Sequence, residues 1–175
     1  VEIDLTKKQN GIILIGGTSK NFHWSNNSII RQIKKIISKS DQINWELTIS
    51  RRTPDEFLNE LKKENLTQIK VLDEKQSIGD WIEKNLPLKE EAWVTIDSVS
   101  MVYESLTASC KTGILELKPK KFTSKISENI EFLWRENYLM SKDGGTTMNL
   151  KTKAFKNEAD MCAKHIVKEL LFLTV

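Results

Sequence analysis

The sequence predicts an α/β domain with a mostly parallel sheet of five or six strands and helices on both faces, a Rossmann-like three-layer arrangement. Three features of the chain support this prediction. Short apolar runs alternate with amphipathic segments, which is typical of strand–helix–strand units joined by right-handed crossovers. The 175 residues are enough for one hydrophobic core. The composition, 39% hydrophobic and 29% charged, is that of a folded globular domain.

The first half of the chain contains two predicted strand–helix units. An unbroken apolar run at residues 11–15, ended by two glycines, predicts a strand buried on both faces of the sheet. Isoleucines at helical spacing predict an amphipathic helix over residues 27–39, and β-prone residues predict a second strand at 43–49. Residues 53–56 have the pattern of a capping box with proline at the first helical position, so a helix is expected over residues 54–64.

The same alternation continues through the second half. Pro87 ends one of the predicted helices, and Asp97 or Ser98 caps the next. In order, the predicted elements are a strand at 68–72, a helix at 78–86, a strand at 93–96, a helix from residue 98, a strand at 113–117, and helices at 123–138 and 155–172 on either side of a glycine-containing loop at 141–147.

Residues 1–10 are interpreted as a linker or crossover segment, and residues 11–175 as a single Rossmann-like domain. The chain begins with Val1 and not with methionine. We therefore expect it to be a fragment of a longer, two-domain chain.

The charge and cysteine content argue against several classes of protein. Lys and Arg number 27 against 24 Asp and Glu, a net charge of +3, and the lysines are scattered in pairs, so no nucleic-acid partner is expected. No stretch approaches the roughly 18 consecutive apolar residues of a membrane span, and no secretory leader opens the chain. Cys110 and Cys162 lie far apart, which fits neither a disulfide framework nor a zinc site and favours a cytoplasmic location.

In open α/β sheets ligands bind beyond the carboxyl ends of the strands, and three segments there carry suitable residues. The first consists of Gly16, Gly17, Thr18, Ser19 and Lys20. Paired glycines let backbone amides approach an anion, and hydroxyls and a cation follow, so phosphate binding is one interpretation. The other interpretation is a tight strand-to-helix turn that needs glycine for its backbone angles.

The second segment consists of Ser50, Arg51, Arg52 and Thr53. Two arginines beside a helix N-terminus are suited to hold a diphosphate or a carboxylate through bidentate hydrogen bonds. The alternative is that Thr53 only caps the helix and that both arginines are ordinary surface residues.

The third segment consists of Asp97, Ser98, Ser100, Met101 and Glu104. On a helix that begins near Ser98, the residues Asp97, Ser100 and Glu104 fall on one polar stripe. Such a stripe is suited to phosphate at the helix N-terminus and to ribose hydroxyls at the carboxylate. The alternative is a solvated helix face.

Other conspicuous residues have simpler interpretations. His23 and His165 are isolated and are interpreted as structural or surface residues. Cys162 lies on an apolar stripe and is expected to be buried, whereas Cys110 lies in a loop. Trp24 directly follows the glycine loop and is therefore a further residue of interest. No Asp-x-Asp pattern occurs, so no metal on a diphosphate is expected, and no catalytic acid or base can be assigned.

Taken together and in this order, segments 16–24, 50–54 and 97–101 resemble the C-terminal half of the mitochondrial-fission "elongated mitochondria" family. Its bacterial relatives are sometimes labelled nucleoside-diphosphate-sugar epimerases. The resemblance covers residues 11–117 well and the last third loosely, and Ser-Arg-Arg-Thr-Pro and Asp-Ser-Val-Ser-Met are its most specific motifs. The chain departs from the family pattern at residues 109–113, where Ser-Cys-Lys-Thr-Gly replaces a Gly-Lys-Pro-Val turn.

The resemblance implies a GT-B-like architecture, in which two Rossmann-like domains face a cleft as in nucleotide-sugar glycosyltransferases. This chain would be the half that binds a UDP- or GDP-type donor, and the missing N-terminal domain would be its partner. The resemblance also implies that Glu104 lies near the ribose, and that Ser98, Ser100 and the 16–19 loop lie near the diphosphate, with no metal or other cofactor.

The leading hypothesis is therefore a glycosyltransferase-like, donor-binding domain whose turnover requires the other half. The alternative is a non-catalytic module that binds a partner protein, because the plant relatives are associated with recruiting fission machinery. A nicotinamide-dependent epimerase is disfavoured, since residues 16–20 lack the Gly-x-Gly-x-x-Gly spacing of a dinucleotide turn.

Overall fold

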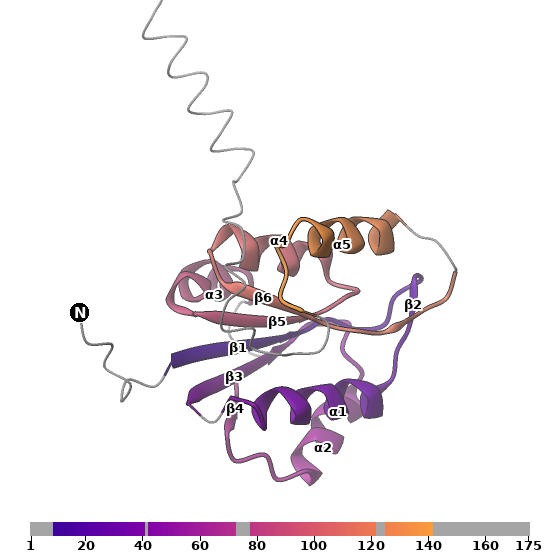
Figure 1. Ribbon diagram of the computed structural model, residues 1–175. Helices are drawn as coiled ribbons and strands as arrows, with labels where there is room; N and C mark the ends of the chain where they lie inside the picture. The colour runs from indigo at the N-terminus through magenta and orange to yellow at the C-terminus, as the bar shows by residue number, and fades with distance from the viewer. Residues whose placement is uncertain (1–8, 41, 73–77, 122–124, 142–175) are drawn as a thin grey trace, which may run out of the picture.

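The computed structural model describes residues 9–40, 42–72, 78–121 and 125–141, and it confirms the predicted α/β class. Five strands form one parallel sheet in the order β4-β3-β1-β5-β6 (Figure 1). The strands of this sheet are β1 (Gln9–Ile15), β3 (Ile43–Ile49), β4 (Ile69–Val71), β5 (Glu91–Thr95) and β6 (Lys111–Leu115).

Helices cover both faces of this sheet, as Figure 1 shows. One face carries α1 (Asn26–Ile37) and α2 (Asp55–Lys63), and the other carries α3 (Ile78–Asn85), α4 (Val99–Thr107) and α5 (Lys125–Arg135). The chain adds strands outward from β1 to β4 and then returns across β1 to form β5 and β6. The strand order therefore reverses between β1 and β5, which is the switch point where open α/β sheets bind ligands at their carboxyl edge.

The hydrophobic core is centred on β1, the middle strand. Its residues from Ile12 to Ile15 are fully buried, and Ile13 lies in register with Leu47 of β3 and Trp93 of β5. Helix α1 adds five buried isoleucines at the spacing that predicts this helix from the sequence. A strand buried on both faces and two layers of helices thus hold the carboxyl ends of β1, β3 and β5 in fixed positions.

A two-stranded antiparallel ribbon, which the sequence pattern does not predict, lies beyond the carboxyl edge of the main sheet. It pairs β2 (Phe22–His23) with β7 (Lys118–Pro119). Strands of two residues are too short to show a period in the sequence. Phe22 is buried beneath the ribbon. Gln32 of α1 supports the approach to β7, because its amide group donates to the carbonyl of Glu116 at 2.8 Å and accepts from the N–H of Glu116 at 2.7 Å.

Most element boundaries differ from the predicted ones by no more than two residues, but α5 ends at Arg135, three residues before the predicted end of its helix at 138. β5 and β6 both begin two residues earlier than predicted, because each strand starts with a charged residue, Glu91 or Lys111, that gives no apolar signal. A 3-10 turn, Leu86–Leu88, follows α3 and contains the proline that was expected to end the helix. The predicted helix at 155–172, the predicted loop beyond residue 141, residues 1–8 of the predicted linker, Cys162 and His165 lie outside the described residues.

Two predicted side-chain caps are wrong. The N-cap of α2 is Pro54 without a side-chain cap, and the hydroxyl of Thr53 donates instead to the backbone carbonyl of Gly16. Ser98 occupies the N-cap of α4 as predicted, but its hydroxyl accepts a hydrogen bond from Arg52 and makes none to the helix backbone. Contacts between loops use both hydroxyls, and a local sequence pattern does not reveal such contacts.

The turn after α4 is the place where the chain departs from the pattern of the family that it resembles. Ser109 has φ of 65°, in the left-handed region that favours glycine, and the N–H of Cys110 donates to the carbonyl of Ser105 at 3.0 Å. Ser109 thus ends the helix with the backbone shape of a glycine. Cys110 is buried, and this burial raises the pKa of its thiol to about 11.

None of the helices in the described ranges combines the length and the apolar character that crossing a bilayer requires.

Glu91, at the start of β5, leads to a testable prediction about the pH dependence of stability. Burial raises the pKa of its carboxyl, while the indole N–H of Trp93, 2.7 Å away, and the charge of Lys111 act in the opposite direction. Because the folded state favours the protonated form, the stability that this group contributes is complete below the ordinary pKa of 4.5 and is lost as the pH rises through the folded pKa. Glu91→Gln should therefore raise the melting temperature at neutral pH and leave it unchanged below pH 4.5.

The matched control is Glu90→Gln at the neighbouring exposed position, which should change neither value. Thermal unfolding across this pH range measures both variants. A Glu91→Gln protein that is less stable than the parent at neutral pH would show that Trp93 and Lys111 outweigh the burial of the carboxylate.

Candidate functional site

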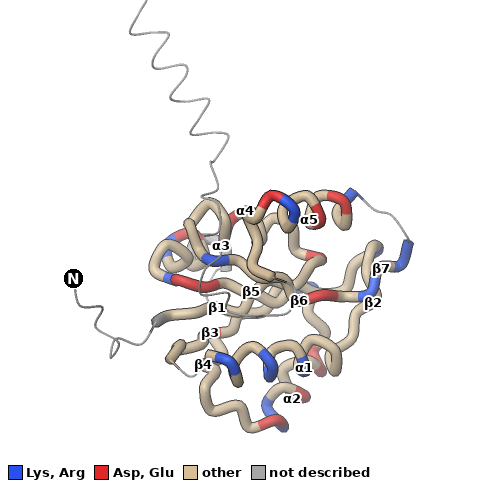
Figure 2. The backbone as a smooth tube through the Cα atoms, viewed as in Figure 1, with Lys and Arg blue, Asp and Glu red and all other residues tan. Residues whose placement is uncertain are grey.

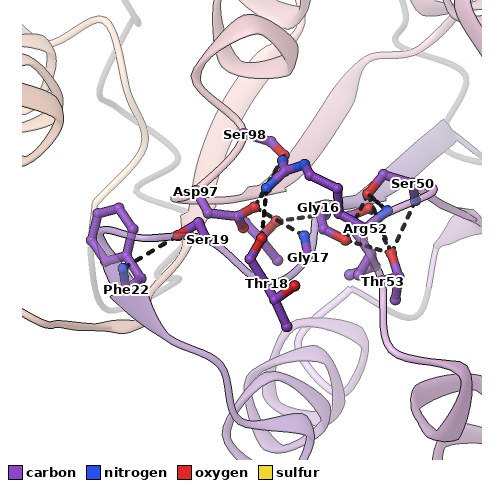
Figure 3. Close-up of polar contacts among 12 residues, drawn as sticks. Gly16, Gly17, Thr18, Ser19, Phe22, Ser50, Arg52, Thr53, Asp97 and Ser98 are labelled. Carbon is purple, nitrogen blue, oxygen red and sulfur yellow. Dashed lines mark hydrogen bonds and ion pairs between the residues drawn. The ribbon is translucent and has the colours of Figure 1, made fainter.

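Three loops converge at the switch point, beyond the ends of β1, β3 and β5 (Figure 3). They are the segments singled out from the sequence: residues 16–20, residues 50–53 and the two residues that precede α4. Hydrogen bonds and an ion pair connect all three loops. We call the connected residues the switch-point cluster: Gly16, Gly17, Thr18, Ser50, Arg52, Thr53, Asp97 and Ser98.

The backbone amides of the glycine loop bind groups of the protein itself. The N–H of Gly16 donates to the hydroxyl of Thr95 at 2.7 Å, and the N–H of Gly17 donates to the carboxylate of Asp97 at 2.9 Å. The next amide, that of Thr18, donates to the carbonyl of Arg52 at 3.1 Å. These three amides are therefore not available to cradle a phosphate in the way that the glycine pair suggests.

Both glycines are required by close packing, and neither has a left-handed backbone. A Cβ atom on Gly16 would overlap the hydroxyl of Ser98 and the carboxylate of Asp97, and one on Gly17 would overlap the backbone of Arg52. The alternative interpretation, a tight turn, is thus wrong about why glycine is needed: the requirement comes from close packing and not from the backbone angles. The absence of side chains here is what lets the loops from β3 and β5 close onto the end of β1.

Arg52 joins the loops that follow β1 and β5. Its guanidinium donates to the carbonyl of Thr18 and to the hydroxyl of Ser98, both at 3.1 Å, and it forms an ion pair with Asp97 at 3.1 Å. The side chain is 47% exposed, so it lies at the rim of the cluster with its charged end turned toward protein groups. One of the two arginines expected at a diphosphate is therefore occupied within the protein.

Asp97 is the buried anion of the cluster. Its side chain is 0% exposed, and its Oδ2 accepts the N–H of Gly17 and faces the guanidinium of Arg52. Its Oδ1 has no hydrogen-bond partner among the described residues. A buried carboxylate is strongly unfavourable unless it is paired, so the amide and the guanidinium are what stabilise Asp97 in this position.

Ser50 and Thr53 fasten the β3 loop to the end of β1. The hydroxyl of Ser50 donates to the carbonyl of Gly16 at 2.9 Å, and the hydroxyl of Thr53 donates to the same carbonyl. The N–H of Ser50 donates to the carbonyl of Ile15 at 2.9 Å. Both side chains thus have a structural role in joining two neighbouring strands.

The N-terminus of α4 opens at the same edge of the sheet. The hydroxyl of Ser98 is bound to Arg52 and does not cap the first turn of the helix, and this turn contains no acidic residue. Ser100 is exposed in this turn, whereas Met101 is partly buried against the core. An uncapped helix N-terminus of this kind presents free N–H groups and a partial positive charge.

The remaining predicted residues of the first two segments lie around the cluster. Arg51 and Lys20 are exposed at the surface. The hydroxyl of Ser19 accepts the N–H of Phe22 at 3.2 Å, and its carbonyl accepts the ammonium of Lys120 at 2.9 Å, so Ser19 links the glycine loop to the ribbon. Arg51 and Lys20 are thus the cations of these segments that face solvent.

Glu104 does not join the cluster. It lies two turns along α4, where it lines a groove of about 690 Å³ between α3 and α4, together with Ile82, Glu83, Leu86, Pro87, Tyr103, Thr107 and Ala108. Partial burial raises the pKa of its carboxyl. The polar stripe predicted from Asp97 to Glu104 is therefore divided, with a buried aspartate at one end and a groove-lining glutamate at the other.

Sequence reasoning missed Thr95 and Lys120, and the other residues of interest lie away from the cluster. Thr95 is fully buried at the last position of β5, where a lone threonine gives no functional signal. Lys120 reaches the glycine loop only because β2 and β7 pair. Trp24 packs edge-on against Phe57 at 6.1 Å between ring centroids, while His23 is exposed on the ribbon.

The strand order, the switch point between β1 and β5, and the loops gathered there define a Rossmann-like α/β domain. The sequence model of the mitochondrial fission ELM1 family matches residues 1–170. The chain therefore belongs to this family, which confirms the resemblance of its three motifs. No curated protein matches the chain.

Proposed function

We propose that this domain binds the diphosphate of a nucleoside-diphosphate sugar at the switch point, as the donor-binding half of a glycosyltransferase-like enzyme. The observation that carries the proposal is the N-terminus of α4, which opens beside the switch-point cluster without a side-chain cap and without an acidic residue in its first turn. Free amides and the helix dipole together attract phosphate groups.

The proposal divides the two arginines between different tasks. Arg52 positions the loops, because its guanidinium is bound to Asp97, Ser98 and the backbone of Thr18. The exposed Arg51 and Lys20 supply the positive charge for the diphosphate. The hydroxyls of Thr18 and Ser100, both exposed residues at this edge, add hydrogen-bond donors.

Glu104 retains its expected contact with the ribose in this proposal. The rise of an α-helix puts Glu104 about 9 Å beyond Ser98 along the axis of α4. A nucleotide whose diphosphate lies at the N-terminus and whose nucleoside extends along the helix brings its ribose toward this carboxylate. Ribose hydroxyls would then donate to Glu104.

Donor binding of this kind also accounts for a transfer step. The bond between the anomeric carbon of the sugar and the diphosphate oxygen breaks while an acceptor oxygen bonds to that carbon, so negative charge develops on the diphosphate. The amides of α4 and the guanidinium of Arg51 stabilise this charge. The acceptor site and the general base are assigned to the second Rossmann-like domain that the family resemblance implies.

Titration of the protein with UDP-glucose and GDP-mannose tests the proposal, with tryptophan fluorescence as the measurement. A saturable change is expected with one of them. Arg51→Ala should weaken binding about tenfold, because a charge-assisted hydrogen bond to phosphate is lost. The matched control is Arg31→Ala, which removes an exposed arginine from α1 and should not change the affinity.

Equal affinities of the Arg51→Ala and Arg31→Ala proteins would contradict the assignment of Arg51. If a protein that contains both domains responds to neither nucleotide sugar, donor binding itself is wrong. That result would favour a non-catalytic module that binds a partner protein.

A further inference from the structure

The ribbon of β2 and β7 presents a basic face at the carboxyl edge of the domain. His23 lies directly opposite Lys118 in the ribbon, and the N–H of Lys120 donates to the carbonyl of Asn21 at 2.8 Å, so the pairing continues one residue further. Because alternate residues of a strand share a face, Lys118 and Lys120 point to the same side. Phe22 occupies the other face and is buried.

Four lysines gather here from two parts of the chain about a hundred residues apart. Lys20 precedes β2, and Lys118, Lys120 and Lys121 come from β7 and its continuation; all four are exposed. None of them forms an ion pair with a carboxylate of the described residues. In Figure 2 blue segments mark this end of the molecule at β2 and β7. We call these four residues the lysine cluster.

The four lysines of the cluster are exposed and line none of the three cavities described for this domain. The groove between α3 and α4 and the two cavities beside β3 and β4 are lined by other residues. Lysine carries a compact charge on a flexible stem, without the planar fork by which arginine binds a single phosphate in two places. Spread over an exposed ribbon, these charges match an extended negative surface better than a discrete ligand.

We propose that the lysine cluster docks the domain on an anionic bilayer, with the phosphate-bearing headgroups as its partners. Clusters of four to eight basic residues are attracted to the negative surface of a membrane, and each contributes separately. The ribbon and the switch-point cluster lie at the same edge of the sheet, and Lys120 connects them through the carbonyl of Ser19 at 2.9 Å. A docked domain therefore turns its donor edge toward the membrane.

A nucleic acid is a less suitable partner for the same lysines. Single strands bind through aromatic side chains on which the bases stack. On the ribbon the aromatic residue Phe22 is buried, and the nearby Trp24 packs against Phe57. The net charge of the chain is also only +3, which is small for a protein that binds polyanions.

Sedimentation of the full chain with vesicles tests this proposal. Vesicles of phosphatidylcholine with about 30% phosphatidylserine should bind the protein at low salt, and binding should fall as the salt rises to roughly 0.3 M. Vesicles of phosphatidylcholine alone should not bind it. The triple variant Lys118→Gln, Lys120→Gln and Lys121→Gln should lose about 100-fold in partitioning onto the anionic vesicles.

The control is the triple variant Lys62→Gln, Lys63→Gln and Lys84→Gln, which removes the same charge from exposed helix ends at the opposite edge of the sheet. It should partition like the parent protein. Equal losses in both variants, or equal binding of the parent to neutral and anionic vesicles, would overturn the proposal. So would binding to single-stranded RNA that is tighter than binding to the anionic vesicles.

These experiments test donor binding and membrane docking independently, so that either proposal can be contradicted without the other. Affinity for UDP-glucose should be the same in the parent and in the double variant Lys118→Gln and Lys121→Gln, which leaves the hydrogen bond of Lys120 to the glycine loop in place. Circular dichroism and thermal unfolding of both triple variants establish that they are folded.

Discussion

Replacing Gly17 by alanine is expected to lower the free energy of unfolding by about 3 kcal/mol or more. A Cβ atom at this position would overlap the backbone carbonyl of Arg52 and the backbone nitrogen of Thr53. Unlike a side chain, a backbone segment cannot rotate out of the way, so the β3 loop must move and lose the hydrogen bond from the N–H of Thr18. Urea or thermal unfolding measures the effect.

Two further variants sharpen this prediction. Gly16→Ala should be less harmful than Gly17→Ala, because its Cβ meets the ends of the Ser98 and Asp97 side chains and not the backbone. Thr18→Ala at an exposed position should cost little. If Gly17→Ala unfolds at the same denaturant concentration as Thr18→Ala, then the loops do not pack as closely as described.

Replacing Arg52 by alanine should have the second largest effect, a loss of about 2 kcal/mol in the free energy of unfolding. The variant leaves the buried carboxylate of Asp97 without its cation, with the N–H of Gly17 at 2.9 Å and the hydroxyl of Ser98 at 3.5 Å as its hydrogen-bond donors among the described residues. Removing one partner of a fully buried ion pair costs about 3–5 kcal/mol, and the value here is lower because half of the Arg52 side chain is exposed to water.

A double-mutant cycle tests whether the unpaired charge is the cause. Asp97→Asn removes the charge and keeps an oxygen that accepts the N–H of Gly17, so Arg52→Ala should be much less destabilising in that background. Strictly additive losses would contradict the pairing. Arg51→Ala, one residue away and exposed, should leave the stability unchanged.

The sheet and its helices could be predicted from the sequence because each element has a local signal. The apolar run at residues 12–15 is buried on both faces, and the isoleucines of α1 face the core at the expected spacing. The ribbon has no such signal, since two-residue strands are paired by segments distant in the sequence. The lysine cluster could not be predicted for the same reason, because its residues come from two segments that are distant in the sequence.

The position of the candidate site was predictable, but its internal contacts were not. Residues that follow parallel strands must meet at one edge, and so the segments at Gly16, Arg52 and Asp97 come together. Which hydroxyl, amide or guanidinium then bonds to which partner depends on distances of a few tenths of an ångström between loops. For this reason two predictions were wrong: that Thr53 caps α2, and that the backbone amides of the glycine loop are free to bind a phosphate.

The hydrogen bonds of Gly16 have a consequence for how this sequence can evolve. Its carbonyl accepts from the hydroxyls of Ser50 and Thr53, and its N–H donates to the hydroxyl of Thr95. Loss of any one hydroxyl weakens the anchoring of Gly16, which is buried, and the loss of the Thr95 hydroxyl leaves its buried N–H unpaired. The effects of mutations at these three positions should therefore not be additive, because all three hydroxyls bind the same residue.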